Sequence, residues 1–265
     1  KPDRFLNAAG NSSAETIGNV IIKADAVMGE LSPHALLLLG DTNSCLAVIA
    51  AKRRKIPIFH MEAGNRCFDQ RVPEEINRKI VDHVSDINLT YTEHARRYLL
   101  AEGLRPEMVI KTGSPMKEIL DHHQERIAAS DVLSRLELKE QQYFLVSAHR
   151  EENIDSDRNF SDFLATLDAV ARKYSHPVVV STHPRTQKRL NEKGRTGTDG
   201  RVRFLKPMGF FDYVHLQQRA FCVISDSGTI TEETSLLDFP AVTIRQAHER
   251  PEGMDEGTLI MCGLE

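Results

Sequence analysis

The chain has 265 residues, which is enough to bury a sizeable core and to form two α/β domains. Hydrophobic residues make up 40% of the chain, and no apolar run reaches the roughly 20 residues that a membrane span needs. The net charge of -4 and the four scattered cysteines, which lack metal-ligand spacing, argue against a nucleic-acid surface and a metal site. We therefore expect a cytoplasmic protein with reduced thiols and no membrane, nucleic-acid or metal partner.

Short apolar runs alternate with longer amphipathic stretches, which is the pattern of parallel strands joined by helices. The first half predicts strands at 35–39, 57–60, 87–91 and 109–111, with helices at 44–54, 74–84 and 93–101. Beyond residue 111 the chain turns helical and charged to about residue 139. A second series follows, with strands at 143–147, 177–181, 202–205, 221–224 and 241–244, and helices at 160–174, 211–219 and 230–237.

This repeated rhythm predicts an α/β protein with two Rossmann-like, doubly wound parallel-sheet domains that face a cleft. We place the first domain at 1–118, a connection at 119–140 and the second domain at 141–265. The chain starts at Lys1 without a first strand and ends on the apolar run 259–265. Both domains are therefore expected to lack an end.

Ligands of open parallel sheets bind beyond the carboxyl ends of the strands, so we expect ligand-binding residues at these positions. Polar residues are concentrated just after the predicted strands, which would not be expected if charged residues were spread at random over the surface. They are Asp41, Glu62, Thr112 to Ser114, His149, Arg150, His183, Ser225 to Thr229 and Arg245.

The segment 225–229 joins a strand to a helix, whose first-turn amide groups lack partners and attract anions. Hydroxyl groups of Ser227 and Thr229 add donors, and Gly228 lets the backbone approach a ligand closely. Arg250, further along the chain, can complement a negative charge. The segment predicts a phosphate site, and the alternative interpretation is an ordinary helix N-cap.

Three carboxylates, Asp41, Glu62 and Glu74, form a second group of candidates. Carboxylates gathered in one site can divide acid and base roles, because burial and mutual repulsion separate their pKa values. Singly, Asp41 also fits a helix N-cap, and Glu74 also fits an ordinary first-turn acid. Of the 11 histidines, His149 has the best position, at a strand end where the domains should meet, although a lone histidine is often structural.

The sequence contains no Walker loop, dinucleotide fingerprint, zinc-protease motif or serine-hydrolase elbow. Bound NAD, zinc catalysis and serine hydrolysis therefore have no sequence support. We expect no cofactor.

Four segments together resemble the non-hydrolysing UDP-N-acetylglucosamine 2-epimerases, namely 60–66, 73–78, 226–228 and 249–252. They follow the order of that family over nearly the whole chain. The resemblance implies an isomerase with two Rossmann-like domains, related to two-domain glycosyltransferases and acting as a homodimer. Its reaction would be reversible inversion at C2 of a UDP-linked 2-acetamido sugar, by elimination of UDP to a 2-acetamidoglycal and re-addition of UDP. Within the family, the loop 65–78 looks most like the branch that forms UDP-N-acetyl-L-fucosamine for capsule and O-antigen polysaccharide.

The resemblance also implies roles for individual residues. Asp41, Glu62 and Glu74 would be the acid and base carboxylates, His149 would assist departure of UDP, and Arg78 would orient the carboxylates or the substrate. UDP would be held by His183, Ser227, Gly228, Thr229, Glu233 and Arg250, with Tyr213 against the uracil. Many family members carry a second glycine where this chain has Thr229, so the phosphate contact is expected to be altered.

Three other functions use the same fold or pocket. A glycosyltransferase would use Ser227, Gly228 and Glu233 equally well, but it has little use for three carboxylates on the first domain. A hydrolysing 2-epimerase would release UDP and free sugar. A nucleotide-sugar sensor would keep the pocket without chemistry, and the intact carboxylates and His149 argue against it.

Overall fold

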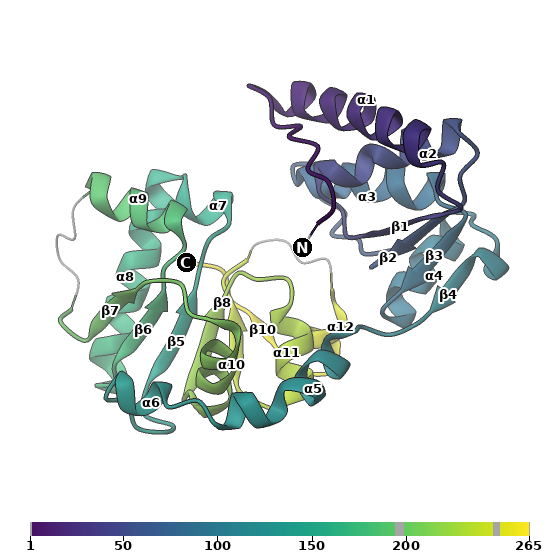
Figure 1. Cartoon of the computed structure of the whole chain (residues 1–265). Coiled ribbons are helices and arrows are strands. Elements are labelled where there is room, and N and C mark those ends of the chain that lie inside the picture. Colours follow the sequence, from purple (N-terminus) through teal and green to yellow (C-terminus); the bar gives the residue numbers. More distant parts are fainter. Residues whose placement is uncertain (1, 194–198, 246–249, 265) are drawn as a thin grey trace. The chain divides into compact units, whose positions relative to one another are not determined.

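The computed structural model describes residues 2–193, 199–245 and 250–264. The chain divides into two compact units, unit 1 at Lys1–Ser114 and unit 2 at Pro115–Glu265. Each unit is an α/β structure around one parallel sheet (Figure 1). The predicted fold class of two parallel-sheet domains is confirmed.

Unit 1 contains a four-stranded parallel sheet in the order β1-β2-β3-β4. The strands are β1 Leu36–Leu39, β2 Ile58–Met61, β3 Ile87–Thr90 and β4 Val109–Lys111. The helices are α1 Ser13–Leu31, α2 Val48–Arg53, α3 Pro73–Val84 and α4 Glu93–Ala101, with 3-10 turns η1 Asn43–Ala47 and η2 Pro106–Met108. One apolar cluster joins α1, η1, α2 and α3 to β1 and β2, and this cluster includes Met28, Leu46, Val48, Ile58 and Val81.

Helix α1 is absent from the sequence-based prediction. The Ser12 side chain caps it by accepting the Glu15 N–H, which satisfies one of the free first-turn donors. Val20, Ala24 and Met28 are buried along it. Their spacing of four residues places them on one helix face, which packs on η1 and α2.

Unit 2 contains a six-stranded parallel sheet in the order β10-β9-β8-β5-β6-β7. The strands are β5 Phe144–Ser147, β6 Val178–Ser181, β7 Val202–Leu205, β8 Cys222–Ser225, β9 Ala241–Thr243 and β10 Ile260–Met261. The helices are α5 Met116–Ala128, α6 Val132–Arg135, α7 Glu151–Ile154, α8 Asp157–Tyr174, α9 Pro184–Lys193, α10 Phe210–Arg219, α11 Ile230–Leu237 and α12 Glu252–Asp255. The strand order reverses beside β5, because the chain first adds β6 and β7 on one side and later β8 on the other. In open α/β sheets a ligand crevice forms at such a reversal.

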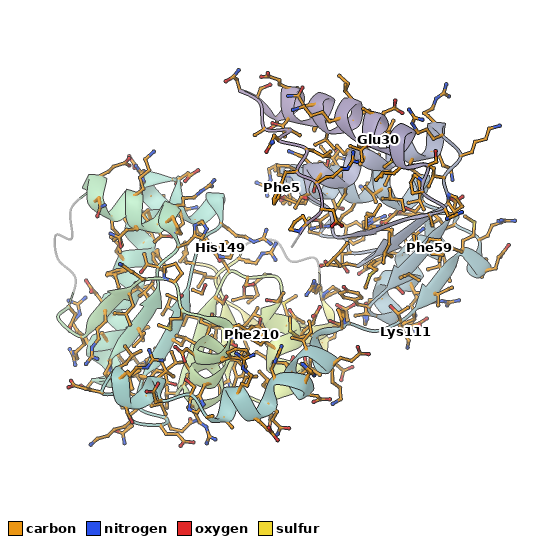
Figure 2. The ribbon with its side chains drawn as sticks, in the orientation of Figure 1. Phe5, Glu30, Phe59, Lys111, His149 and Phe210 are labelled. Atoms are coloured by element: carbon orange, nitrogen blue, oxygen red, sulfur yellow. The ribbon has the colours of Figure 1, made fainter. Side chains whose placement is uncertain are left out.

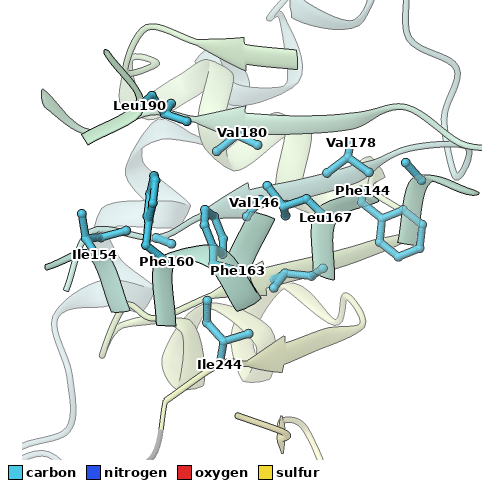
Figure 3. Packing of buried hydrophobic residues seen from close by; sticks show 13 residues of the cluster. Phe144, Val146, Ile154, Phe160, Phe163, Leu167, Val178, Val180, Leu190 and Ile244 are labelled. Carbon is cyan, nitrogen blue, oxygen red and sulfur yellow. The ribbon is translucent and has the colours of Figure 1, made fainter. Parts of the chain in front are cut away.

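Strand β5 is buried on both faces, as expected for the centre of a parallel sheet. Phe144 and Val146 join Phe160 and Phe163 of α8 in one apolar cluster (Figure 3). Leu145 points to the opposite face and joins a second cluster with residues of α10 and β8. Alternate residues of β5 thus pack into apolar clusters on the two faces of the sheet. This packing fixes the strand end that is followed by residues 148–150.

Residues 119–140, which the sequence predicts to connect the domains, contain α5 and α6. Helix α5 packs against α10 through Leu120, Ile127 and Val214. The segment is therefore part of unit 2. Among the described residues, no helix is long and apolar enough to cross a membrane.

Candidate functional site

In unit 1, Asp41 and Glu62 lie just beyond the carboxyl ends of the neighbouring strands β1 and β2. The Gly40 N–H donates to the Met61 carbonyl across this edge (3.2 Å). A Cβ atom added to Gly40 would lie 3.7 Å from Glu62 Oε2, so the Glu62 carboxylate reaches over the residue before Asp41. Glu62 has a left-handed φ of +66°, a conformation that costs about 1–3 kcal/mol outside glycine and is often found at functional sites. The two residues predicted to be catalytic thus lie at neighbouring strand ends.

His60 fixes the spacing of these strand ends. Its ring is fully buried, with Nε2 2.9 Å from the Gly40 carbonyl oxygen and Nδ1 2.8 Å from Asp82 Oδ1 on α3. Asp82 also accepts from Gly64 N–H and from Arg66 Nη1, both in the loop that follows Glu62. Backbone before Asp41 and after Glu62 is therefore tied to one buried carboxylate.

Helix α3 supplies the partners of Asp41. Arg78 Nε donates to Asp41 Oδ2 (2.6 Å), and Asn77 Nδ2 donates to the Asp41 carbonyl (2.9 Å). Because the Asp41 carboxylate is engaged with Arg78 and the residue that caps η1 is Thr42, the N-cap interpretation of Asp41 is wrong. Glu74 is half-buried in the first turn of α3, beside these groups in the sequence.

Glu75 was not predicted from the sequence as a site residue, but it lies at the centre of these contacts. Its side chain is fully buried and accepts from Arg78 Nη1 (2.9 Å) and from the N–H groups of Cys67 (3.0 Å) and Phe68 (3.2 Å). The adjacent pair Glu74-Glu75 could have raised the question of which carboxylate faces inward.

In unit 2, His149 follows β5 and Asp226 follows β8, the two strands that flank the reversal of strand order. Asp226 is fully buried and accepts from the N–H groups of His149 and Arg150 (3.0 Å each) and from Asn153 Nδ2 (3.1 Å). His149 Nδ1 lies 3.0 Å from Asp226 Oδ1. The side chain of His149 is 42% exposed (Figure 2), so its Nε2 is the nitrogen available to a ligand.

Burial by itself would raise the pKa of Asp226, but the hydrogen bond and charge of His149 and the donors Arg150 and Asn153 lower this pKa overall. Asp226 is therefore a buried anion that orients the His149 imidazole, the arrangement that fixes one tautomer in catalytic histidines. From the sequence, Asp226 was expected only as part of a phosphate loop, and its contact with His149 was not expected.

The loop 225–229 brings the predicted phosphate ligands together. Ser227 Oγ and Thr229 Oγ1 lie 3.0 Å apart, and Arg250 Nη1 donates to the Gly228 carbonyl (3.1 Å). Thr229 occupies the N-cap position of α11, but its side chain makes no capping hydrogen bond and donates to Glu233 instead (2.8 Å). The Thr229 hydroxyl therefore does not cap α11, while Ser227 Oγ accepts the Thr229 N–H at the start of that helix (3.4 Å).

The remaining predicted ligands lie around this loop or beside it. The His183 ring, after β6, is 5.8 Å from the His149 ring between centroids. Tyr213 on α10 is half-buried against the second apolar cluster of unit 2, and burial together with the charge of Glu233 raises its pKa. Among the described residues, no group of three or more His, Cys, Asp or Glu side chains is placed to hold a metal ion.

The surroundings of Glu233 disfavour the ionised form of its carboxylate. Burial and the neighbouring Glu232 raise its pKa above the ordinary value of 4.5, although hydrogen bonds from Gln217 and Thr229 and the charge of Arg250 oppose this shift. The folded protein holds this proton at higher pH than the unfolded chain does. Stability therefore falls as the pH rises from 4.5 through the raised pKa.

We expect the substitution Glu233→Gln to raise the melting temperature at pH 7.5 by about 2–4 °C, the effect of about 1 kcal/mol in a chain of this size. Gln217 Nε2 now donates to Glu233, while the buried Gln217 Oε1 has no hydrogen-bond partner. If the Gln217 amide rotates by 180°, its Oε1 can accept a hydrogen bond from the new amide at position 233. Thermal melts from pH 4 to pH 8 check this, since the gain should vanish near pH 4. A loss of stability at all pH values would contradict the assignment.

The whole chain, residues 1–265, matches the family model described as UDP-N-acetylglucosamine 2-epimerase. A UDP-N-acetylglucosamine 2-epimerase of Methanococcus maripaludis is 32% identical over 273 residues, which cover 100% of this chain and 74% of that protein. The solved structure of a UDP-N-acetylglucosamine 2-epimerase from Rickettsia bellii is 55% identical, with a TM-score of 0.90, and the match covers 100% of this chain and 70% of that one.

A second solved structure, of the Methanocaldococcus jannaschii UDP-GlcNAc 2-epimerase in complex with UDP-GlcNAc and UDP, is 29% identical. Its TM-score is 0.91, and the match covers 100% of this chain and 75% of that one. Sequence and fold agree along the full chain. The protein belongs to the UDP-N-acetylglucosamine 2-epimerase family and is an isomerase of that family.

Proposed function

We propose that the protein inverts C2 of a UDP-linked 2-acetamido sugar by eliminating UDP and adding it back. The observation that carries this proposal is in unit 2, where a buried aspartate orients His149 at the strand-order reversal. The hydroxyl groups of Ser227 and Thr229 follow the same aspartate in the chain. This arrangement suits a diphosphate that gains negative charge as it leaves.

Unit 2 would bind and release UDP. Backbone donors and hydroxyls of residues 227–229 would hold the diphosphate, together with the guanidinium of Arg250. His149 Nε2 would stabilise the departing oxygen of UDP. Glu233 and His183 would hold the rest of the nucleotide, and Tyr213 would lie against the uracil.

Unit 1 would move the proton at C2. In the elimination, a base removes this proton, its bonding electrons form the C1–C2 double bond, and the C1–O electron pair leaves with UDP. Inversion requires that the proton return to C2 from the opposite face, so at least two proton-carrying groups are needed. Asp41, Glu62 and Glu74 supply such groups, and Arg78 holds Asp41 in place.

We further propose a 6-deoxy UDP sugar as the substrate, as in the UDP-N-acetyl-L-fucosamine-forming branch of capsule and O-antigen synthesis. The support is the resemblance of the loop 65–78, which presents Phe68 with 68% of its surface exposed. An apolar ring suits a methyl group better than a hydroxymethyl group. We also propose a homodimer that acts in the cytoplasm, on the same resemblance.

Proton NMR of the purified full-length protein in deuterated water tests this function. UDP-N-acetylglucosamine and 6-deoxy UDP sugars would be offered in turn, and the signal at C2 followed. We expect deuterium at C2, a new epimer and little free UDP. Stoichiometric UDP and free sugar would indicate a hydrolysing 2-epimerase, whereas UDP binding without exchange for any donor would indicate a transferase or a sensor.

A further inference from the structure

We propose that Glu75 is a positioning residue for the reaction, which holds Arg78 against Asp41 and fixes the loop that follows Glu62. Glu74, one position earlier, is the carboxylate that the family resemblance assigns to chemistry. Glu75 would touch neither substrate nor reacting atoms. The proposal rests on the proposed function for its effect on rate, but not for its effect on the loop.

The contacts of Glu75 join three parts of unit 1. Its carboxylate accepts from Arg78 Nη1 (2.9 Å) on α3 and from the N–H groups of Cys67 (3.0 Å) and Phe68 (3.2 Å) in the loop. Arg78 in turn donates from Nε to Asp41 after β1 (2.6 Å). One buried carboxylate thus links the strand end that carries Asp41 to the loop that begins at Glu62.

The loop needs such support because its backbone is strained at both ends. Glu62 has φ +66° and Phe68 has φ +56°, and neither is a glycine. Asn65 Nδ2 donates to Glu62 Oε1 within the loop (3.4 Å). Two N–H groups held by Glu75 therefore offset the strain at Phe68 and restrict the segment that orients Glu62.

Glu75 also sets the charge around Asp41. The Arg78 side chain is 4% exposed and shares one positive charge between Asp41 and Glu75. Removal of the Glu75 charge takes one carboxylate away from Arg78 while its ion pair with Asp41 remains, so this part of unit 1 becomes less negative. The pH dependence of the reaction should respond to this change even if the fold does not.

Other charged and titratable groups face this pair. Lys79 Nζ lies 3.9 Å from Glu75 and the Cys67 thiol lies 3.4 Å from it, while Cys45 lies on η1 beside Asp41. Burial, chiefly, raises the pKa of both thiols, and the carboxylates Glu75 and Asp41 add to this effect. Both thiols are therefore neutral around pH 7, and Arg78 is the buried cation that the two carboxylates share.

An ordinary first-turn acid would be a simpler role for Glu75, because negative charge near a helix N-terminus is favourable. Glu93 has that role on α4, where it is half-buried and contacts Arg96 and Arg97 by ion pairs. Glu75 differs because it is fully buried and its oxygens are directed at another segment. Glu93→Gln is therefore the matched control.

The first readout is the rate of C2 exchange and its pH profile for Glu75→Gln. We expect kcat to fall roughly tenfold to a hundredfold, as when reacting groups are misplaced by about 1 Å. The acid limb of the kcat/KM profile should move down by about one pH unit. The Kd for UDP should stay within about twofold, since unit 2 holds UDP in the proposed function. Glu75→Asp, which keeps the charge, should keep the wild-type acid limb but not the wild-type kcat.

The second readout does not depend on activity. The rate at which iodoacetamide alkylates Cys67, followed at the peptide level at pH 8, should rise several-fold in Glu75→Gln because the thiol loses a hydrogen-bonding anion and the loop is released. Glu93→Gln should leave that rate unchanged. Equal alkylation rates in Glu75→Gln and wild type, or an unmoved acid limb in a folded variant, would overturn the proposal. If Glu75→Gln does not fold, the alkylation rate of Cys67 in Glu75→Asp takes its place. A rate equal to that of wild type would then overturn the proposal. An inactive wild type would refute the proposed function alone.

Discussion

Asp226→Asn is expected to lower kcat for C2 epimerisation by about 1,000-fold, the scale on which an acid–base group and its orienting partner act. Asparagine keeps one acceptor oxygen, but it presents an NH2 group to a site built from donors. The N–H groups of His149 and Arg150, His149 Nδ1 and Asn153 Nδ2 all face the present carboxylate. His149 would then turn away or adopt the other tautomer, and its Nε2 would no longer serve the departing UDP.

The rate of C2 exchange by proton NMR measures this effect, with circular dichroism to verify that the variant is folded. Asp212→Asn is the matched control, because Asp212 also accepts hydrogen bonds, from Ser130 (2.6 Å) and Arg135 (2.5 Å), where α6 packs on α10. It should leave kcat unchanged. A folded Asp226→Asn variant with kcat within twofold of wild type would show that His149 needs no orientation or takes no part.

Most of the fold could be predicted from the sequence because buried parallel strands are short, apolar and bounded by turns. Every strand from β1 to β9 was predicted, with small differences at the ends. The predicted helix 44–54 is instead the 3-10 turn η1 followed by the short helix α2. Helix α1 was missed although Ser12, Glu15 and the apolar face through Val20, Ala24 and Met28 are readable in the sequence. The exposed positions between them, Ile22 and Ala26, are apolar as well, so the sequence shows little contrast between the buried and the exposed face of this helix.

The positions of site residues could be predicted from the sequence where a residue directly follows one predicted strand. Asp41, Glu62, His149 and His183 lie after β1, β2, β5 and β6, and parallel strands bring such residues to one edge of each sheet. Their roles in the reaction stay predictions.

The two missed carboxylates depend on information that lies outside any local pattern. Glu75 rather than Glu74 is buried because of the rotation of α3 about its axis, which the packing of Asn77 and Arg78 sets. Asp226 meets His149 only because β8 pairs with β5 across a long stretch of chain. A sequence shows which residues end each strand, but not which strands become neighbours.

Arg66→Met is expected to reduce the free energy of unfolding of unit 1 by about 3–5 kcal/mol, as when one partner of a buried ion pair is removed. The Arg66 side chain is fully buried and donates to Asp82 (2.7 Å), to Glu102 (2.7 Å) and to the Asn65 carbonyl (2.8 Å). Methionine fills similar volume but leaves Asp82 with one cationic neighbour fewer. Asp82 must remain in place, because His60 and the Gly64 N–H both depend on it.

Urea unfolding followed by fluorescence and circular dichroism measures this loss, and separate transitions would assign it to unit 1. Arg54→Met is the matched control, since Arg54 pairs with Asp25 by two hydrogen bonds on an exposed surface and its loss should barely move the midpoint. Equal midpoints for the two variants would mean that His60 and the Gly64 N–H suffice to hold Asp82. In that case the strand ends that carry Asp41 and Glu62 would be set by His60, and Arg66 would serve the surface contact with Glu102.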